Sequence, residues 1–197
     1  MEPWIEWVRR LQAIADTGLE YASNSYDRAR YEELRAVAGE VAGQGGGLDS
    51  HGAGHPTPKV DVRGALVRDG RVLLVREVAD GGWTMPGGWA DIGEPPSVSV
   101  EREFREEAGI GVRAVKLFAV HERDRHNSPP HVHHIYKLFF LCEATGEEAS
   151  ATDGETDAVD WFGLEDLPPL STGRTSRGQI ELAFAHHERP DLPTEFD

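Results

Sequence analysis

The chain has 197 residues, of which 20 are basic and 35 acidic, giving a formal net charge of −15. This balance excludes a protein that grips nucleic acid through a broad basic surface, although a small anionic substrate can still bind through a cation. A single cysteine excludes an internal disulfide, and no signal peptide or 18-residue apolar run is found, so we expect a soluble, cytoplasmic protein without a membrane partner.

Residues 3–42 are predicted to form two amphipathic helices with a turn around Ser23–Ser25. Apolar residues recur there at helical spacing, namely Trp4, Ile5, Val8, Leu11, Ile14 and Ala15, then Tyr31, Leu34, Val37, Ala38 and Val41. Two helices of this size cannot bury such stripes alone. The stripes pack either on the rest of the chain or on a second copy, and the prediction we carry forward is a homodimer through these helices.

Residues 43–59 are predicted to be a linker. The stretch contains six glycines together with Pro56 and Pro58, and this composition cannot hold a core. It divides the chain into an N-terminal helical domain, residues 1–42, and a larger domain, residues 60–197.

The larger domain alternates between strand and helix patterns. Apolar runs bounded by turn residues predict strands at 60–68, 72–75, 112–121, 135–142 and 158–162. The run 135–142 is apolar enough for a central strand, which places Cys142 in the core rather than at a reactive site. A final helix is expected at 176–188 and an irregular tail at 190–197. Together these elements predict an α/β sandwich in which helices flank a mixed sheet.

The densest pattern in the chain is a predicted helix that can begin at Pro95–Ser97 and must end by Gly109. Because residues three and four apart share a helix face, Glu103, Glu106 and Glu107 are expected on one side. Three crowded carboxylates repel one another unless a cation sits among them, and hard divalent ions, Mg²⁺ first, suit oxygen ligands. A solvated acidic surface helix is the alternative interpretation.

The wider spacing decides between these two interpretations. Gly88 is followed after five residues by Glu94, and seven residues later by Arg102-Glu103-Phe104-Arg105-Glu106-Glu107-Ala108-Gly109-Ile110. This resembles the Nudix box in full, and so many fixed positions make the signal specific. The helical pair, the segment 136–143 and the end of the chain, 192–197, further resemble the Nudix branch that carries an N-terminal helical domain. That branch includes CDP-choline pyrophosphatases and ADP-ribose pyrophosphatases.

The resemblance implies a magnesium-dependent hydrolase of a nucleoside diphosphate linked to another group, with Mn²⁺ as a possible substitute. Glu106 and Glu107 would be the firmest metal ligands, Glu103 a ligand or a base, and the carbonyl of Gly87 a further ligand. A base can instead come from a loop outside the box. There Glu155 is the leading candidate, and Glu147 and Glu148 are weaker ones. Arg102 and Glu94 are expected to form an ion pair that braces the site.

The substrate-binding residues are less defined by the sequence. Arg76, Arg123 and Arg125 could each bind a phosphate bidentately or could be surface charges. Tyr136 and Trp83 could stack on a base or pack on a choline group. The His-rich stretch 121–134 is predicted to be a loop that contacts substrate or is simply solvated. CDP-choline and ADP-ribose therefore remain equal candidates.

Two further classes of function stay open at this point. One is a sensor that binds a nucleotide sugar without turnover, although such modules usually have a degraded box. The other is an assembly module whose helical pair mediates association. The sequence does not identify the general base, the linked group or the phosphorus that is attacked.

Overall fold

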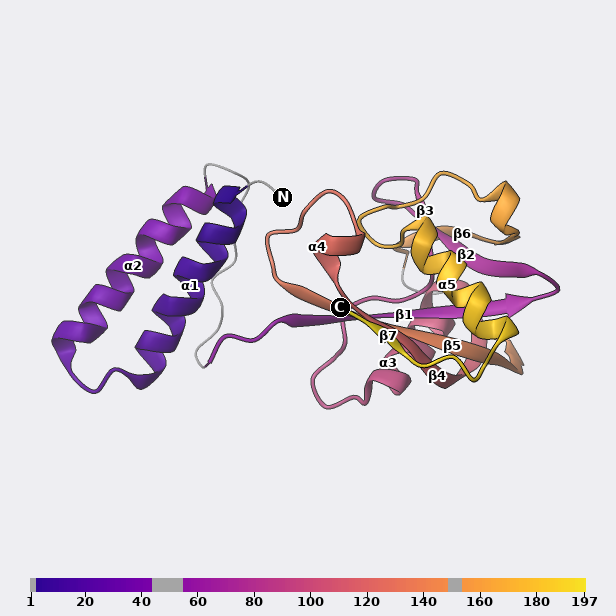
Figure 1. The fold of residues 1–197 in the computed structure, drawn as a ribbon, viewed down its shortest axis with the longest axis horizontal. Coiled ribbons are helices and arrows are strands. Elements are labelled where there is room, and N and C mark those ends of the chain that lie inside the picture. The colour runs from indigo at the N-terminus through magenta and orange to yellow at the C-terminus, as the bar shows by residue number, and fades with distance from the viewer. Residues whose placement is uncertain (1–2, 44–54, 149–153) are drawn as a thin grey trace. The chain divides into compact units, whose positions relative to one another are not determined.

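The computed structural model describes residues 3–43, 55–148 and 154–197 (Figure 1). The chain forms two compact units, one of Met1–Lys59 with Pro130–His134 and the other of Val60–Pro129 with Ile135–Asp197. Most of the predicted linker lies outside the described residues, as do the side chains of Glu147 and Glu148.

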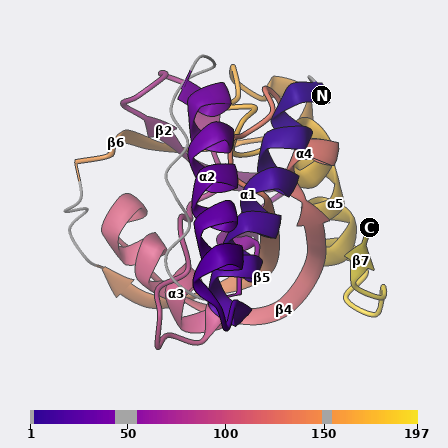
Figure 2. The same ribbon diagram turned by 90° about the vertical axis from the view of Figure 1, so that its left-hand side faces the viewer.

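The helical unit is an antiparallel pair, α1 (Pro3–Tyr21) and α2 (Ser25–Gly43), whose axes lie side by side (Figure 2). Asn24 caps the second helix, because its Oδ1 accepts a hydrogen bond of 2.8 Å from the Asp27 amide. Arg9 of α1 ties in the segment 130–134: its guanidinium donates to the carbonyls of His131 and Val132. The helix prediction is therefore confirmed over both spans.

The second unit is built on a seven-stranded mixed sheet. Its strands are β1 (Lys59–Arg68), β2 (Arg71–Glu77), β3 (Trp83–Thr84), β4 (Ile110–Glu122), β5 (Ile135–Glu148), β6 (Thr156–Phe162) and β7 (Glu195–Phe196). The order is β3-β2-β1-β5-β4-β7, with β6 pairing to β2. The pairing of β4 with β7 is parallel, whereas β4 and β5 are antiparallel.

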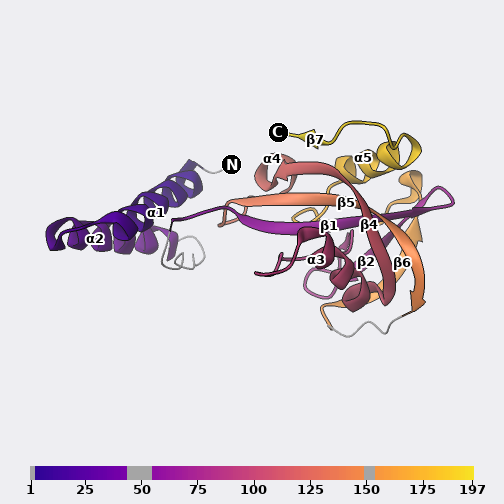
Figure 3. The same cartoon turned by 90° about the horizontal axis from the view of Figure 1, so that it is seen from below.

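Helices cover both faces of this sheet (Figure 3). On one face, α5 (Arg177–Glu188) contributes Ile180, Ala183 and Phe184 to a buried apolar cluster. On the other face, α3 (Pro96–Glu103) and the π-helical turn η1 (Phe104–Ala108) contribute Val100 and Phe104 to a second cluster. Two short helices, α4 (Arg123–His126) and η2 (Leu164–Asp166), lie in the connections. The predicted α/β sandwich is confirmed.

Strand β1 is buried on both faces and sets how closely the helix approaches. Its side chains alternate, so that Ala65 joins the α5 cluster and Leu66 the α3 cluster. Gly64, directly before them, leaves room for the helix, because a Cβ there would lie 2.3 Å from the Phe104 ring. This close contact fixes the acidic helix against the sheet.

The tail departs from the sequence prediction. Residues 190–197 were expected to be irregular, yet Glu195 and Phe196 form β7 beside Ala119 and Val120. His126 Nε2 and Asp197 Oδ1, 2.7 Å apart, add a polar contact at the same place. Two residues are too few to show strand periodicity, and the pairing depends on a partner strand far away in the sequence.

Candidate active site

The acidic helix has the limits that its sequence indicates. α3 begins at Pro96, and the π-helical turn that continues it is closed by Gly109, which has a left-handed φ of 66° and donates to the Phe104 carbonyl. Val100 and Phe104 are fully buried. The π turn changes the angular spacing at the end of the helix, so that Glu107 points inward while Glu106 stays half exposed.

The turn Met85–Gly88 lies against β1 and faces this helix. The amides of Gly64 and Val62 donate to the carbonyls of Pro86 (2.9 Å) and Gly88 (2.8 Å). Between them Gly87 has a φ of 143°, and a Cβ at this residue would lie 2.0 Å from the Val62 carbonyl oxygen. Only glycine fits here. Its amide donates to Glu107 Oε2 at 2.9 Å, which joins the turn to the helix.

Glu107 is the most buried carboxylate of the box, with 3% of its surface exposed. Burial raises its pKa to about 8, although the Arg63 charge and the Gly87 amide act in the opposite direction. Burial likewise raises the pKa of Glu103, against the charges of Arg102 and Arg63. Both carboxylates therefore lie where an added cation would stabilise their ionised form.

Arg102 is the cation that the other acidic side chains share. Its guanidinium lies 3.1 Å from Glu103, 2.8 Å from Glu106 and 3.2 Å from Glu94. It also contacts Asp91 at 3.2 Å. The predicted Arg102–Glu94 ion pair is confirmed, and Arg102 holds two of the three predicted metal-ligand carboxylates as well.

Glu155 lies at the border of the same site. Its carbonyl accepts from the Val78 amide at 2.9 Å, and the neighbouring Thr156 hydroxyl donates to the Glu107 carbonyl at 3.0 Å. Burial raises the pKa of Glu77, and the negative charges of Asp80 and Glu155 add to this rise. The structure thus brings Gly87, Glu107 and Glu155 into one neighbourhood from three separate segments.

Several charged residues of this neighbourhood were missed by sequence reasoning. Glu77, at the end of β2, is buried and bonded to Arg174 at 2.9 Å. Asp61, Arg63 and Lys137 form a buried cluster under the Met85–Gly88 turn. The sequence contained a signal for this cluster, namely charged residues inside otherwise apolar strands. Such residues are buried only when they have partners, so their presence could have indicated a buried charge cluster.

The predicted substrate-binding residues fall into two groups. Arg76, Arg125 and Tyr136 have substantial exposed surface, and Arg76 makes a two-bonded ion pair with Asp157 (2.7 and 3.0 Å). Arg123 is instead buried, and its Nη1 donates to Asp124 (2.7 Å) and to the Pro129 carbonyl (2.8 Å). These bonds brace the turn after β4, so burial does not suit Arg123 for the predicted phosphate contact.

The donor set fits a hard divalent cation. Carboxylate and carbonyl oxygens are the ligands such ions prefer. Among the described hydrogen bonds none uses the Gly87 carbonyl, whereas both neighbouring carbonyls are occupied. Within the described ranges no three acidic, His or Cys side chains are gathered as a ready-made cluster. Glu103 and Glu106 are instead ion-paired with the Arg102 guanidinium.

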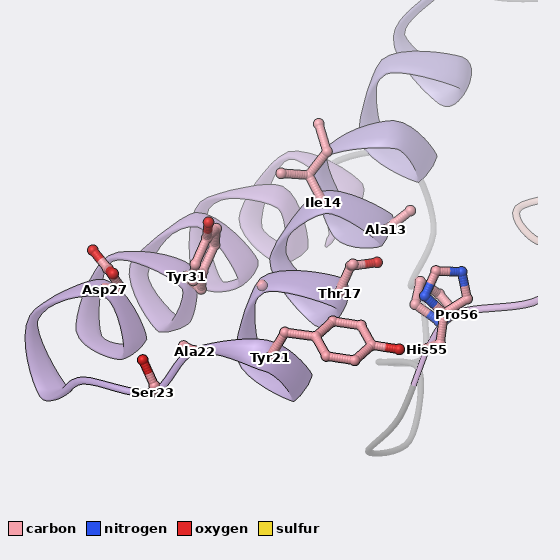
Figure 4. A pocket seen from close by; sticks show the side chains of 11 residues that line it. Ala13, Ile14, Thr17, Tyr21, Ala22, Ser23, Asp27, Tyr31, His55 and Pro56 are labelled. Carbon is pink, nitrogen blue, oxygen red and sulfur yellow. The ribbon is translucent and has the colours of Figure 1, made fainter.

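A separate hollow of about 690 Å³ lies in the helical unit (Figure 4). It is lined by Ile14, Thr17 and Tyr21 of α1, Tyr31 of α2, and His55. None of the predicted site residues borders it. Among the described helices none is long and apolar enough to cross a membrane.

The fold is that of a class of hydrolases, and comparisons with known proteins assign the chain to it. The NUDIX domain pattern matches residues 57–183, and a second pattern, described as the UDP-X-like N-terminal oligomerisation domain, matches residues 2–50. The chain belongs to the Nudix family and is a Nudix hydrolase with an N-terminal helical domain. The family resemblance of the sequence is thereby confirmed.

Relatives of known structure or curated name share most of the chain. A protein of Bacillus subtilis (strain 168), provisionally named the ADP-ribose pyrophosphatase YjhB, is 38% identical over 98% of this chain and 97% of its own length. A crystal structure of an ADP-ribose pyrophosphatase from Streptococcus suis 89-1591 is 35% identical, with a TM-score of 0.66 over 72% of this chain and 100% of its own. A crystal structure of a UDP-X diphosphatase is 28% identical, with a TM-score of 0.66 over 99% and 98% of the two chains.

Proposed function

We propose that the protein hydrolyses the pyrophosphate bond of a nucleoside diphosphate linked to another group, releasing a nucleoside monophosphate and the phosphorylated group. The observation that carries the proposal is the placement of the box: Glu107 is bonded to the Gly87 amide, and Glu103 and Glu106 lie beside it on the same helix end. The full-length similarity to proteins named as pyrophosphatases supports the same reaction.

The site would hold Mg²⁺, or Mn²⁺ in its place, through Glu103, Glu106, Glu107 and the Gly87 carbonyl. When bound, the metal would neutralise the negative charge of the substrate phosphates and lower the pKa of a bound water molecule. The chain itself orients one of these carboxylates, because the Gly87 amide fixes Glu107, whereas Glu103 and Glu106 would exchange their ion pairs with Arg102 for the metal ion. Glu155 is the proposed general base because it is exposed and borders Glu107, and Glu103 is the second candidate.

Arg76, Arg125 and Tyr136 are proposed as substrate contacts. Arg76 directly precedes the buried Glu77 and stacks near Trp83, with its guanidinium 6.0 Å from the indole ring. Trp83 itself packs edge-on against Phe162, with ring centroids 4.8 Å apart. This packing suits a structural role in the wall of the site better than stacking on a substrate base. An exposed arginine suits a phosphate that arrives from solvent.

ADP-ribose is the first substrate we propose, because relatives similar over most of the chain carry that name. CDP-choline and UDP-linked diphosphates are the other members of the class to be tested. The oligomer we propose is a homodimer through α1 and α2, supported by the oligomerisation domain pattern over residues 2–50. The alternative of a non-catalytic sensor is not supported, since the box is intact.

A substrate panel tests this proposal. Purified protein would be given ADP-ribose, CDP-choline, a UDP-sugar, NADH and nucleoside triphosphates, each with Mg²⁺, with Mn²⁺ and with EDTA, and products separated by chromatography. We expect AMP and ribose 5-phosphate from ADP-ribose, and no turnover in EDTA. Triphosphate hydrolysis with a kcat/KM about tenfold above every linked diphosphate, equivalent to ~1.4 kcal/mol of transition-state binding, would refute the proposed substrate class.

A further inference from the structure

A buried cluster of three charged residues lies directly under the turn that carries Gly87. Arg63 donates to both carboxylate oxygens of Asp61, through Nε and Nη2, each at 3.0 Å. Lys137 donates to the same carboxylate at 2.7 Å. All three side chains are buried, with at most 10% of any side chain exposed. A buried charge cluster costs folding free energy unless its charges balance, so its composition needs a reason.

The charges of this cluster do not balance by themselves, because two cations meet one carboxylate. The surplus is visible in Lys137, whose pKa is lowered to about 8 by burial and by the neighbouring Arg63 charge, against the attraction of Asp61. For Arg63, burial also opposes the charged form, yet Asp61, Glu107 and Glu77 keep its pKa above the ordinary value. Two carboxyl groups outside the cluster, those of Glu107 and Glu77, therefore favour the charged form of Arg63.

Arg63 also makes the only contacts from this cluster to the turn that the described hydrogen bonds contain. Its Nη1 donates to the Met85 carbonyl at 3.2 Å and reaches the Thr84 hydroxyl at 3.4 Å. Two residues further on, the Gly87 amide donates to Glu107. Arg63 thus bonds to the beginning of the Met85–Gly88 turn, and the same turn bonds to Glu107, the most buried carboxylate of the Nudix box.

We propose that Arg63 is a positioning residue of the hydrolytic site: a fixed internal cation, clamped by Asp61, that sets the Met85–Gly88 turn so that the Gly87 carbonyl and Glu107 face one metal ion together. The inference rests on the proposed function. Lys137 has a different task, which is to help neutralise Asp61. The two cations of one cluster are thereby separable, since Arg63 touches the turn and the described contacts of Lys137 do not include it.

Two variants with the same charge change test this separation. Arg63→Gln and Lys137→Gln each remove one positive charge and leave Asp61 with one cation. Mn²⁺ affinity is measured on the full chain without substrate, from the electron paramagnetic resonance signal of free Mn²⁺, alongside thermal melting. Loss of a nearby positive charge alone would tighten Mn²⁺ binding in Arg63→Gln, because like charges repel. Loss of the positioning of the turn would weaken Mn²⁺ binding instead. Whether the Mn²⁺ affinity rises or falls in Arg63→Gln therefore distinguishes the charge effect from the positioning effect.

For Arg63→Gln we expect Mn²⁺ affinity to fall by about tenfold or more, and kcat/KM on the substrate found in the panel to fall by roughly 10- to 100-fold, as for residues that orient metal ligands. For Lys137→Gln we expect both quantities to stay within about threefold of wild type. Arg63→Lys keeps the charge but cannot bond Asp61 and Met85 at once, so it should not restore Mn²⁺ binding.

Several results would overturn the inference. These are unchanged or tighter Mn²⁺ binding in Arg63→Gln, equal losses in the two glutamine variants, or full restoration by Arg63→Lys. If Arg63→Gln does not fold, Arg63→Lys carries the comparison. If neither folds while Lys137→Gln does, Arg63 serves folding and not the site. A wild-type protein that binds no Mn²⁺ and turns over no substrate refutes the proposed function instead, which keeps the two failures distinct.

Discussion

The two units of the chain bury apolar side chains in very different ways. The second unit, Val60–Pro129 with Ile135–Asp197, is called here the hydrolase unit. It has an apolar cluster on each face of its sheet, with large side chains such as Phe104, Phe118 and Phe139 fully buried. In the described part of the helical unit the buried apolar residues are Val8 and three alanines, Ala15, Ala38 and Ala42. Several of its large side chains are exposed: Trp7 is 60% exposed, Ile14 53% and Tyr21 69%.

This difference shows that the two units obtain their stability from different sources. Burial of apolar area contributes ~25 cal/mol per Å², so two filled clusters can support a fold alone. A helix pair held by alanine contacts has little such area and leaves an apolar surface uncovered. The hydrolase unit is therefore expected to be self-sufficient, whereas the helical unit depends on a partner surface.

The largest effect should come from the acidic helix of the hydrolase unit. Glu107→Gln and Glu106→Gln each remove a proposed metal ligand and should lower turnover by at least ~10²-fold, at or above the upper end of losses seen for supporting residues. Because an amide oxygen at position 107 can still accept from the Gly87 amide, and the half-exposed Glu106–Arg102 ion pair contributes little, the melting temperature should change little. Steady-state kinetics at saturating Mg²⁺ and thermal melting check both statements.

A matched control for these variants is Glu181→Gln, which changes a surface glutamate on α5 paired with Arg177. It should retain wild-type kinetics. Near wild-type rates in both Glu106→Gln and Glu107→Gln would contradict their assignment as metal ligands.

The next effect concerns the stability of the same unit. Gly87→Ala places a methyl group 2.0 Å from the Val62 carbonyl in a left-handed conformation, whereas Gly70→Ala has a left-handed φ of 72° but open space around it. We expect Gly70→Ala to cost ~1 kcal/mol in free energy of unfolding and Gly87→Ala ~3 kcal/mol or more, since strain and overlap add. Urea unfolding measures both, and equal costs would show that the turn can relax away from β1.

A substitution on the helical unit should halve the mass of the protein in solution, if that unit forms the proposed homodimer. Ile14→Glu puts a charge on the exposed apolar face of α1, so the proposed homodimer should dissociate into monomers by light scattering at micromolar concentration. Val115→Glu makes the same change at an exposed position of β4 and should leave the mass unaltered. A wild-type chain that is monomeric, or an Ile14→Glu variant that stays dimeric, would remove the proposal.

The smallest change is expected from labelling of Cys142. Burial raises the pKa of this thiol, so it should not react with a disulfide reagent in the native protein and should react once denaturant opens the hydrolase unit. As the sole cysteine of the chain it reports on that unit alone. Its labelling should be the same in Ile14→Glu and wild type if the hydrolase unit is self-sufficient, and rapid labelling in native buffer would contradict the burial of Cys142.

Local signals explain what could be predicted from the sequence. The helix limits at Pro96 and Gly109 follow from a proline that suits a first turn and a glycine that suits a left-handed cap. Apolar runs bounded by turn residues, at 60–68 and 135–142, predicted the core strands β1 and β5. The Nudix box spacing identified the family, because its positions are close together in the chain.

Features made by distant parts of the chain could not be predicted. The inward orientation of Glu107 depends on a π-helical turn. Placing residues on a face by α-helical periodicity does not reveal such a turn. The burial of Arg63 and Lys137 depends on Asp61 pairing with a residue 76 positions away. β7 needs β4 as its partner. For Lys137 and for β7 the decisive contact joins residues that no short window contains.

Arg102 gives the acidic helix a counter-ion of its own, attached to the same helix as Glu103 and Glu106. In the proposed metal-bound state the two glutamates would exchange one cation for another, and the free energy of metal binding would be a difference between two competing sets of contacts. Loss of the proposed ion would return Glu103 and Glu106 to Arg102, so the helix would keep a counter-ion and stay folded. The activity we propose would then follow the supply of free metal in the surroundings while the folded protein persists.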